Sequence, residues 1–153
     1  MGVTAEQIRA EAKGPLSQIV LEYSRVMKQL VDAAKTPGFT VDSWGPLAEL
    51  VAVKDFVRVG AFKEVVDWRQ YTTILTQWAT TSLWDCSFKR IDEIPGRVYL
   101  ELEERSGEGE GMDVVNSLTV YDFNADNKLV HLGIYLQRAM REQDMGGWES
   151  AGD

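Results

Sequence analysis

VYDFNADNKLV, residues 120–130, closes a long region in which apolar and polar residues alternate. The region begins at Leu83 and ends at Arg138, and the chain reverses its direction three times within it. Alternation with a period of two is typical of β-strands that bury one face. Amphipathic helical segments precede the region, and no helix-sized segment interrupts it. Helices followed by a curved antiparallel sheet predict an α+β fold rather than an alternating α/β one.

The length and composition are those of one globular domain. The chain has 153 residues, of which 44% are hydrophobic and 26% are charged, and both fractions are ordinary. The formal net charge is −8. This charge argues against binding to nucleic acid, which needs a basic surface, and against binding to an anionic membrane surface.

Nothing in the sequence predicts a targeting signal, a membrane span or a metal site. The first 13 residues are charged and lack the apolar run of a signal peptide, and no segment approaches transmembrane length. The single cysteine, Cys86, excludes an internal disulfide, and one cysteine with one histidine excludes the common zinc sites. We therefore expect a cytoplasmic protein without a metal or cofactor.

Helical and strand periodicities predict the order of the elements. The predicted helices are a short one over 4–13, a long one from Pro15 to just before Thr36, a short one from Pro46 capped by Ser43, and one over 67–80. The predicted strands cover 56–59, 84–94, 97–105, 112–123 and 129–138, with a hairpin loop at 106–111. They form one domain over 15–138, between an N-terminal extension (1–14) and a flexible tail (139–153).

This order of elements resembles the ketosteroid isomerase-like, or SnoaL-like, superfamily, whose fold is that of nuclear transport factor two. The residues that carry the resemblance are Val59-Gly60 after the first strand, Asp67-Trp68 at the third main helix, residues 120–130, and Ile134-Tyr135-Leu136. The resemblance covers about 15–138. It implies a sheet curled into a cone around an apolar cavity, which helices close and which takes uncharged, hydrophobic substrates.

The resemblance leaves neither of two known chemistries of the superfamily intact. The general base of the ketosteroid isomerases falls near Gly60 and their hydrogen-bonding acid near Thr119, so both carboxyl groups are missing here. Their helix tyrosine corresponds loosely to Tyr23. The arginine and the paired aspartates of the epoxide hydrolases fall near Leu102, Glu104 and Ile134. The chain is therefore predicted to be a relative of these enzymes, and not a member of either family.

Arg58 is the first candidate for a polar group in the cavity. It alternates with Val57 and Val59, and the register of the superfamily points it into the cone. A guanidinium in an apolar cavity needs a partner, which would be a carboxylate or the ligand itself. The alternative is that Arg58 projects into solvent from an edge strand.

Three hydroxyl side chains, those of Ser117, Thr119 and Tyr121, share one face of a predicted strand. A buried tyrosine hydroxyl needs a partner and could polarise a carbonyl or epoxide oxygen of a ligand. Tyr23, on the apolar face of the long helix, has the same potential. The alternative is that these tyrosines are core residues bonded to the backbone.

Several other residues have a functional and a structural interpretation. Trp44, Trp78 and Trp84 could line an aromatic pocket together with the inward-facing Leu132 and Ile134, although tryptophans at helical spacing are usually core residues. His131 is expected on the convex face of the sheet, and Cys86 is expected to be an inert buried thiol. The acidic cluster is interpreted as a solvated face and contains Glu101, Glu103, Glu104, Glu108 and Glu110.

These observations predict a small cofactor-independent enzyme that isomerises, dehydrates or cyclises an apolar substrate, or opens an epoxide, by acid–base chemistry. The candidate catalytic residues are Arg58, Tyr121, Thr119 and Tyr23, with Arg58 and Tyr121 binding an oxygen of the ligand. The alternative is a non-catalytic, dimeric module for ligand binding or scaffolding. A second ionisable group that faces Arg58 in the cavity would favour the enzyme.

The convex face of the predicted sheet carries a mixed apolar patch. It contains Asn116, Leu118, Val120, His131 and Tyr135. Such a patch on a sheet is more often an interface than bare surface, so we expect a homodimer.

Overall fold

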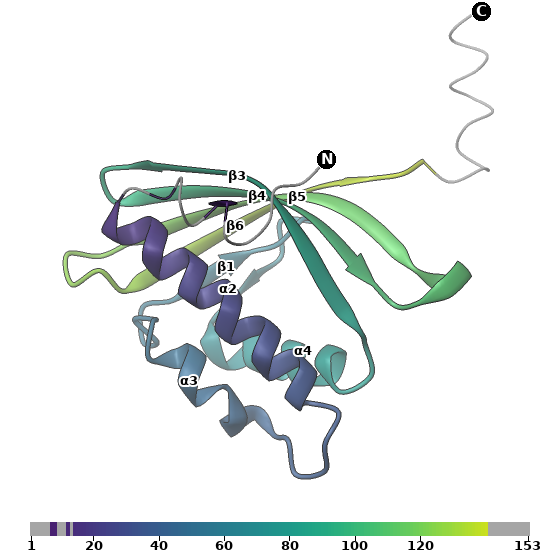
Figure 1. The fold of residues 1–153 in the computed structure, drawn as a ribbon. Coiled ribbons are helices and arrows are strands. Elements are labelled where there is room, and N and C mark those ends of the chain that lie inside the picture. Colours follow the sequence, from purple (N-terminus) through teal and green to yellow (C-terminus); the bar gives the residue numbers. More distant parts are fainter. Residues whose placement is uncertain (1–6, 9–11, 13, 141–153) are drawn as a thin grey trace, which may run out of the picture.

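The computed structural model describes residues 7–8, 12 and 14–140 as helices packed on one face of a strongly curved, open sheet (Figure 1). The helices are α2 (Pro15–Ala33), α3 (Gly45–Ala48) and α4 (Trp68–Ala79), with 3-10 turns η1 (Val41–Trp44) and η2 (Gly109–Gly111). The strands are β1 (Val57–Val59), β2 (Val65–Val66), β3 (Trp84–Ile94), β4 (Arg97–Ser106), β5 (Asp113–Phe123) and β6 (Leu129–Arg138). The predicted α+β fold is confirmed.

The six strands form one sheet in the order β2-β1-β6-β5-β4-β3. All neighbours are antiparallel except β1 and β6, which run parallel. The predicted hairpins are confirmed, since β3 pairs with β4 from Ile94 and Arg97 outward, and β5 pairs with β6. Irregularities in the register of β3 and of the β5–β6 pair add local twist, which helps the sheet to curl.

Turn residues explain why the last hairpin reverses where the sequence predicts. Asn127 has a positive φ of 58°, which asparagine tolerates better than most residues. The side-chain oxygen of Asn124 accepts hydrogen bonds from the backbone N–H groups of Asp126 and Lys128. The turn therefore satisfies its own polar groups and fixes the register of β5 and β6.

The predictions for α2 and α4 are confirmed at their ends. Pro15 occupies the first turn of α2, whose apolar stripe faces the core. Asp67 caps α4, because its carboxylate accepts a hydrogen bond from the N–H of Gln70 while the Gln70 side chain accepts one from the Asp67 N–H. This reciprocal arrangement is a capping box, and it satisfies two of the N–H groups at the start of the helix.

The shorter elements differ from the predictions in three details. Ser43 does not cap α3, whose N-cap is Trp44 without a side-chain hydrogen bond; it lies in η1, where its hydroxyl accepts a hydrogen bond from the N–H of Thr40, the N-cap of that turn. The short helix ends at Ala48, because the next backbone groups pair with the start of β6: the Leu50 carbonyl accepts from the Leu129 N–H, which removes this segment from the helix. The first strand begins one residue later than predicted, since Phe56 is a buried core residue outside β1.

The predictions for the two ends of the chain concern residues that the structure describes only in part. The helix predicted over 4–13 and the tail after 139 lie largely outside the described residues. Ile8, which is described, is fully buried in the core. In the part of the chain that is described, no helix combines the length and the apolar character that a membrane span needs.

The two faces of the sheet are sorted as the alternation predicts. Leu100 and Leu102 face the core, whereas Leu118 and Tyr135 are exposed on the outer face. His131 also lies on the outer face, with its Nδ1 3.5 Å from a carboxylate oxygen of Asp122. The homodimer that this outer face suggests remains a prediction.

A carboxylate from the sheet replaces the missing cap of α2. The N-cap position is Gly14, which has no side chain, and the Glu93 Oε1 on β3 accepts a hydrogen bond of 2.6 Å from the Ser17 N–H. The negative charge also lies at the positive end of the helix dipole. Glu93 therefore joins the beginning of α2 to an edge of the sheet.

We expect Glu93→Ala to lower the free energy of unfolding by about 0.5–2 kcal/mol, the usual cost of losing an N-terminal cap. Urea denaturation followed by circular dichroism measures the change. The control is Glu101→Ala, on the outer face of β4, which should change stability by no more than about 0.5 kcal/mol. Equal effects of the two substitutions would contradict a capping role for Glu93.

Candidate active site

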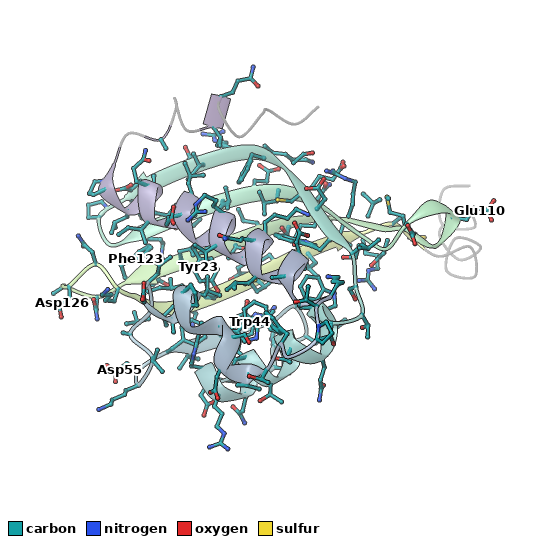
Figure 2. All side chains as sticks on the ribbon, turned by 60° about the horizontal axis from the view of Figure 1, so that its bottom comes forward. Tyr23, Trp44, Asp55, Glu110, Phe123 and Asp126 are labelled. Carbon is teal, nitrogen blue, oxygen red and sulfur yellow. The ribbon has the colours of Figure 1, made fainter. Side chains whose placement is uncertain are left out.

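A cavity of about 440 Å³ lies between the inner face of the sheet and the helices α2 and α4. Met27, Leu75 and Leu132 give most of it an apolar wall. Its polar lining residues come from separate elements: Tyr23 and Ser24 from α2, Arg58 from β1, Tyr71 from α4, Glu104 and Ser106 from β4, Asp113, Thr119 and Tyr121 from β5, and Arg138 from β6. Figure 2 shows Tyr23 at the centre of the molecule, under the helices.

Strand pairing explains how these polar residues meet. Arg58 is paired with Leu132 on β6, and Leu132 is paired with Tyr121 on β5, which is paired in turn with Val98 on β4. The row crosses four strands, and directly paired residues point to the same side of a sheet. Arg58 and Tyr121 therefore enter one cavity although they are far apart in the sequence.

Three buried tyrosines form the middle of the site. Tyr23, Tyr71 and Tyr121 are 5%, 7% and 5% exposed. The rings of Tyr23 and Tyr121 meet edge to face with centroids 5.8 Å apart, and the guanidinium carbon of Arg58 lies 5.0 Å from the centroid of the Tyr71 ring. The ring of Phe56 stacks on the ring of Tyr71, with centroids 5.8 Å apart, and so packs Tyr71 in place.

The environment keeps these hydroxyl groups protonated at neutral pH. Burial raises the pKa of Tyr23 well above its ordinary value, and the neighbouring Tyr71 and Tyr121 raise it further. Burial also raises the pKa of Tyr71 and of Tyr121, although the nearby Arg58 lowers that of Tyr71. The site therefore presents neutral O–H donors, which suit a carbonyl, epoxide or enolate oxygen.

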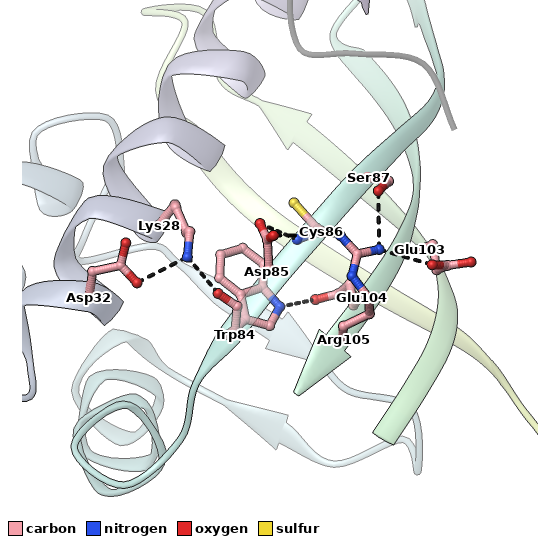
Figure 3. Close-up of polar contacts among 9 residues, drawn as sticks. All are labelled: Lys28, Asp32, Trp84, Asp85, Cys86, Ser87, Glu103, Glu104 and Arg105. Atoms are coloured by element: carbon pink, nitrogen blue, oxygen red, sulfur yellow. Dashed lines mark hydrogen bonds and ion pairs between the residues drawn. The ribbon is translucent and has the colours of Figure 1, made fainter. Parts of the chain in front are cut away.

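Glu104 brings a carboxylate into the same cavity. Its Oε1 accepts a hydrogen bond of 2.9 Å from the indole Nε1 of Trp84, as Figure 3 shows. Trp84 is itself packed against Trp78, with ring centroids 6.1 Å apart. The indole thus fixes the position of the carboxylate, and the second carboxylate oxygen has no hydrogen-bond donor among the described residues.

Glu104 and its neighbours on β4 face opposite sides of the sheet. Glu103 accepts a hydrogen bond of 2.9 Å from Arg105 on the outer face, where Arg105 also contacts Ser87 and Asp85 (Figure 3). Glu104 shares its face with the buried Leu100 and Leu102. The sequence interpretation that placed Glu104 in a solvated acidic cluster is therefore wrong. Two signals pointed to the cavity: its parity with the two leucines, and the resemblance, which placed it near one of the polar residues of the epoxide hydrolases.

Comparison with known proteins identifies the architecture. No family model and no curated protein matches the chain. Among solved structures, an LEH-like epoxide hydrolase from M. tuberculosis is 14% identical with a TM-score of 0.55, and the match covers 82% of this chain and 87% of that one. An NTF-2-like protein of unknown function from Burkholderia xenovorans LB400 is 14% identical with a TM-score of 0.57, and the match covers 90% and 95%. The chain has the nuclear transport factor two-like fold.

A third solved structure with this fold is SalBIII, described as an epoxide hydrolase/cyclase-like enzyme with a role in pyran ring formation in the polyether salinomycin. It is 14% identical with a TM-score of 0.56, and the match covers 84% of this chain and 92% of that one. At such identities the likeness concerns the nuclear transport factor two-like fold alone. The chemistry of this chain has to be argued from its own cavity.

Most of the residues predicted for the site line the cavity of this nuclear transport factor two-like protein. Arg58 lies in the cavity, which decides between the two alternatives left open by the sequence. The other predicted residues that line it are Tyr23, Thr119, Tyr121, Trp78, Trp84, Leu132 and Ile134. Their roles remain predictions, because lining a cavity does not establish a function.

Two predicted pocket residues do not line this cavity. Trp44 is 1% exposed and belongs to the packing between the helices, where its indole Nε1 donates a hydrogen bond of 2.8 Å to the Thr76 hydroxyl. Its ring meets Phe39 edge to face. Ser117 faces inward and is buried, but it lies outside the cavity lining, and its hydroxyl has no partner among the described residues.

The remaining candidates for special chemistry, Cys86 and the tip of the acidic cluster, do not line the cavity. Burial raises the pKa of the Cys86 thiol to about 11, which fits the predicted inert thiol. Across residues 7–8, 12 and 14–140, no group of three or more His, Cys, Asp or Glu side chains converges as a metal site would require. Glu110, from the acidic cluster, lies at the tip of the β4–β5 hairpin, far from the helices (Figure 2).

Proposed function

We propose that this protein is an enzyme that moves a proton on a largely apolar small molecule bound in the cavity. The observation that carries the proposal is the Glu104 carboxylate, which lines the same cavity as Arg58 and three protonated tyrosine hydroxyls. A carboxylate can accept and return a proton, and hydroxyl donors can stabilise the oxygen on which negative charge develops. The reaction would be an isomerisation, a cyclisation or the opening of an epoxide.

Each of these reactions uses the same two parts of the site. In an isomerisation, Glu104 removes a proton from a carbon next to a carbonyl group, the tyrosine hydroxyls donate to the enolate oxygen, and the proton returns to another carbon. In an epoxide opening, Glu104 takes a proton from the attacking hydroxyl group or water while a tyrosine donates to the epoxide oxygen. Trp84 supports both reactions, since its indole keeps the carboxylate in place.

The alternative is a binding module without catalysis. The sequence interpretation made a second ionisable group that faces Arg58 in the cavity the criterion for distinguishing the two. Glu104 lines the same cavity but does not pair with Arg58, so it supports the enzyme by sharing the cavity and not by contact with the guanidinium. The fold is also that of the LEH-like epoxide hydrolase and of SalBIII, which supports the reaction classes without assigning one.

Two probe reactions test the proposal. The wild-type protein is incubated with 2-tetralone in D₂O, where NMR follows exchange of the protons next to the carbonyl, and with styrene oxide, where chromatography follows diol formation. We expect acceleration of at least one reaction over buffer, and we expect Glu101→Gln, on the outer face of the same strand, to retain it. Binding of both probes without any acceleration would contradict an enzyme and support the binding module.

A further inference from the structure

Arg58 has no counter-ion among the residues that the structure describes. Among the described residues, no carboxylate lies within 4 Å of its guanidinium, although the side chain is half-buried in the cavity wall. Its Nε is buried without a hydrogen-bond partner in the same part of the chain. One face of the guanidinium is covered by the Tyr71 ring. A cation that is partly removed from water and left unpaired is costly, and it is stabilised when a ligand brings the missing charge.

Tyr23 adds an unused donor beside this cation. The side chain is 95% buried, since 5% of it is exposed, and among the residues that the structure describes its hydroxyl makes no hydrogen bond of good geometry, although the neighbouring Tyr71 is close enough to raise its pKa. Arg58 is close enough to Tyr23 to lower the pKa of that hydroxyl, against the stronger effect of burial. A guanidinium and neighbouring O–H donors together match the two oxygens of a carboxylate group.

The other charges of the cavity limit the ligand to a single negative charge. Arg138 also lines the cavity, but it already pairs with Asp113 at 3.2 Å. Asp113 lines the cavity as well and is neutralised in that pair, so Glu104 is the charged lining residue without a cationic partner among the described residues, and it would repel a second anionic group. One free guanidinium therefore suits a monocarboxylate better than a phosphate dianion.

The two ends of the cavity are chemically different. The Arg58 row meets β4 at Val98, and Glu104 follows Val98 by six residues on that strand, which is about 20 Å along an extended chain. Tyr71 lines the same cavity, and its hydroxyl is affected by both charges, since Arg58 lowers its pKa while Glu104 raises it. A ligand anchored at Arg58 would extend its apolar body past the tyrosines toward Glu104.

We propose that the ligand is an apolar monocarboxylic acid whose carboxylate binds Arg58 and whose other end reaches Glu104. This inference rests on the proposed function only for what happens at the Glu104 end. It departs from the expectation of an uncharged substrate that the resemblance of the sequence implies. It concerns binding, so affinity tests it without any turnover.

The test compares 2-naphthylacetate with 2-naphthylacetamide, which has nearly the same shape but no charge, by isothermal titration calorimetry at pH 7. We expect the acid to bind the wild-type protein at least tenfold more tightly than the amide. Arg58→Met should abolish this preference, and Arg58→Lys should keep part of it. Arg90→Met, at an exposed arginine on β3, is the matched control and should leave the preference unchanged.

Several results would overturn the inference. They are equal affinities of the acid and the amide for the wild-type protein, no binding of either, or a preference for the acid that survives Arg58→Met. The wild-type comparison alone decides the matter if Arg58→Met does not fold. A preference for the acid without catalysis of any probe would reject the proposed function and keep the inference, whereas turnover of neutral probes without the preference would do the reverse.

Discussion

Replacing Glu104 by glutamine should lower kcat/KM for whichever probe the wild-type protein turns over by about 10²–10⁴-fold, the usual contribution of a positioned general base. The amide oxygen of glutamine can still accept the hydrogen bond from the Trp84 indole, so the geometry should persist. The amide cannot accept the proton at neutral pH, so the proton-transfer step should be lost. Steady-state kinetics with 2-tetralone or styrene oxide measures the loss.

The control for this prediction is Glu101→Gln, which removes the same charge from the opposite face of β4. It should leave kcat/KM within about twofold, because a charge on the outer face is separated from the cavity by the sheet and is screened by solvent. The melting temperatures of both variants should stay close to that of the wild type. Retention of full activity by a folded Glu104→Gln protein would show that Glu104 is not the base.

Trp44→Ala should lower the free energy of unfolding by about 3–5 kcal/mol, the cost of emptying the space of a large aromatic core residue. The side chain is 1% exposed, and the substitution also removes the hydrogen bond that the indole donates to Thr76. Urea denaturation followed by circular dichroism measures the loss. If the alanine variant does not fold, Trp44→Phe should fold with a smaller loss, because it fills most of the space.

Phe62→Ala is the comparison for Trp44. Phe62 is 88% exposed at the turn between β1 and β2, so its loss should change stability by no more than about 0.5 kcal/mol. Similar effects of the two substitutions would contradict the assignment of Trp44 to the core. Because Trp44 lies outside the cavity lining, Trp44→Phe should leave the affinity for 2-naphthylacetate unchanged.

The sheet could be predicted from the sequence because its strands bury one face only. Alternation then fixes which side each residue faces, as it does for Leu100, Leu102 and Leu118. The same rule places Arg58 and Tyr121 inside once the strand order is known. Glu104 was assigned to the solvated face because it lies in a run of acidic residues. Alternation along the backbone, however, fixes the face of each strand residue, and the charge of its neighbours does not change that face.

Short elements could not be predicted with the same security. Ser43 is a good N-cap residue by type, but here it lies inside the turn η1 that precedes α3, and Trp44 takes the N-cap position of that helix. Trp44 has the spacing of a pocket residue, but the side on which its helical turn packs is set by α4 and Phe39. Local patterns specify how an element folds, and contacts with the rest of the chain specify where it lies.

The parallel pairing of β1 with β6 has a consequence for how the chain is made. During synthesis β1 leaves the ribosome long before β6, its partner, has been assembled. Until then Arg58 has no wall opposite it, and the helical half must hold its apolar stripe without the sheet that covers it. Such a nascent chain exposes hydrophobic surface until β6 has been made, and transiently exposed surface of this kind favours aggregation.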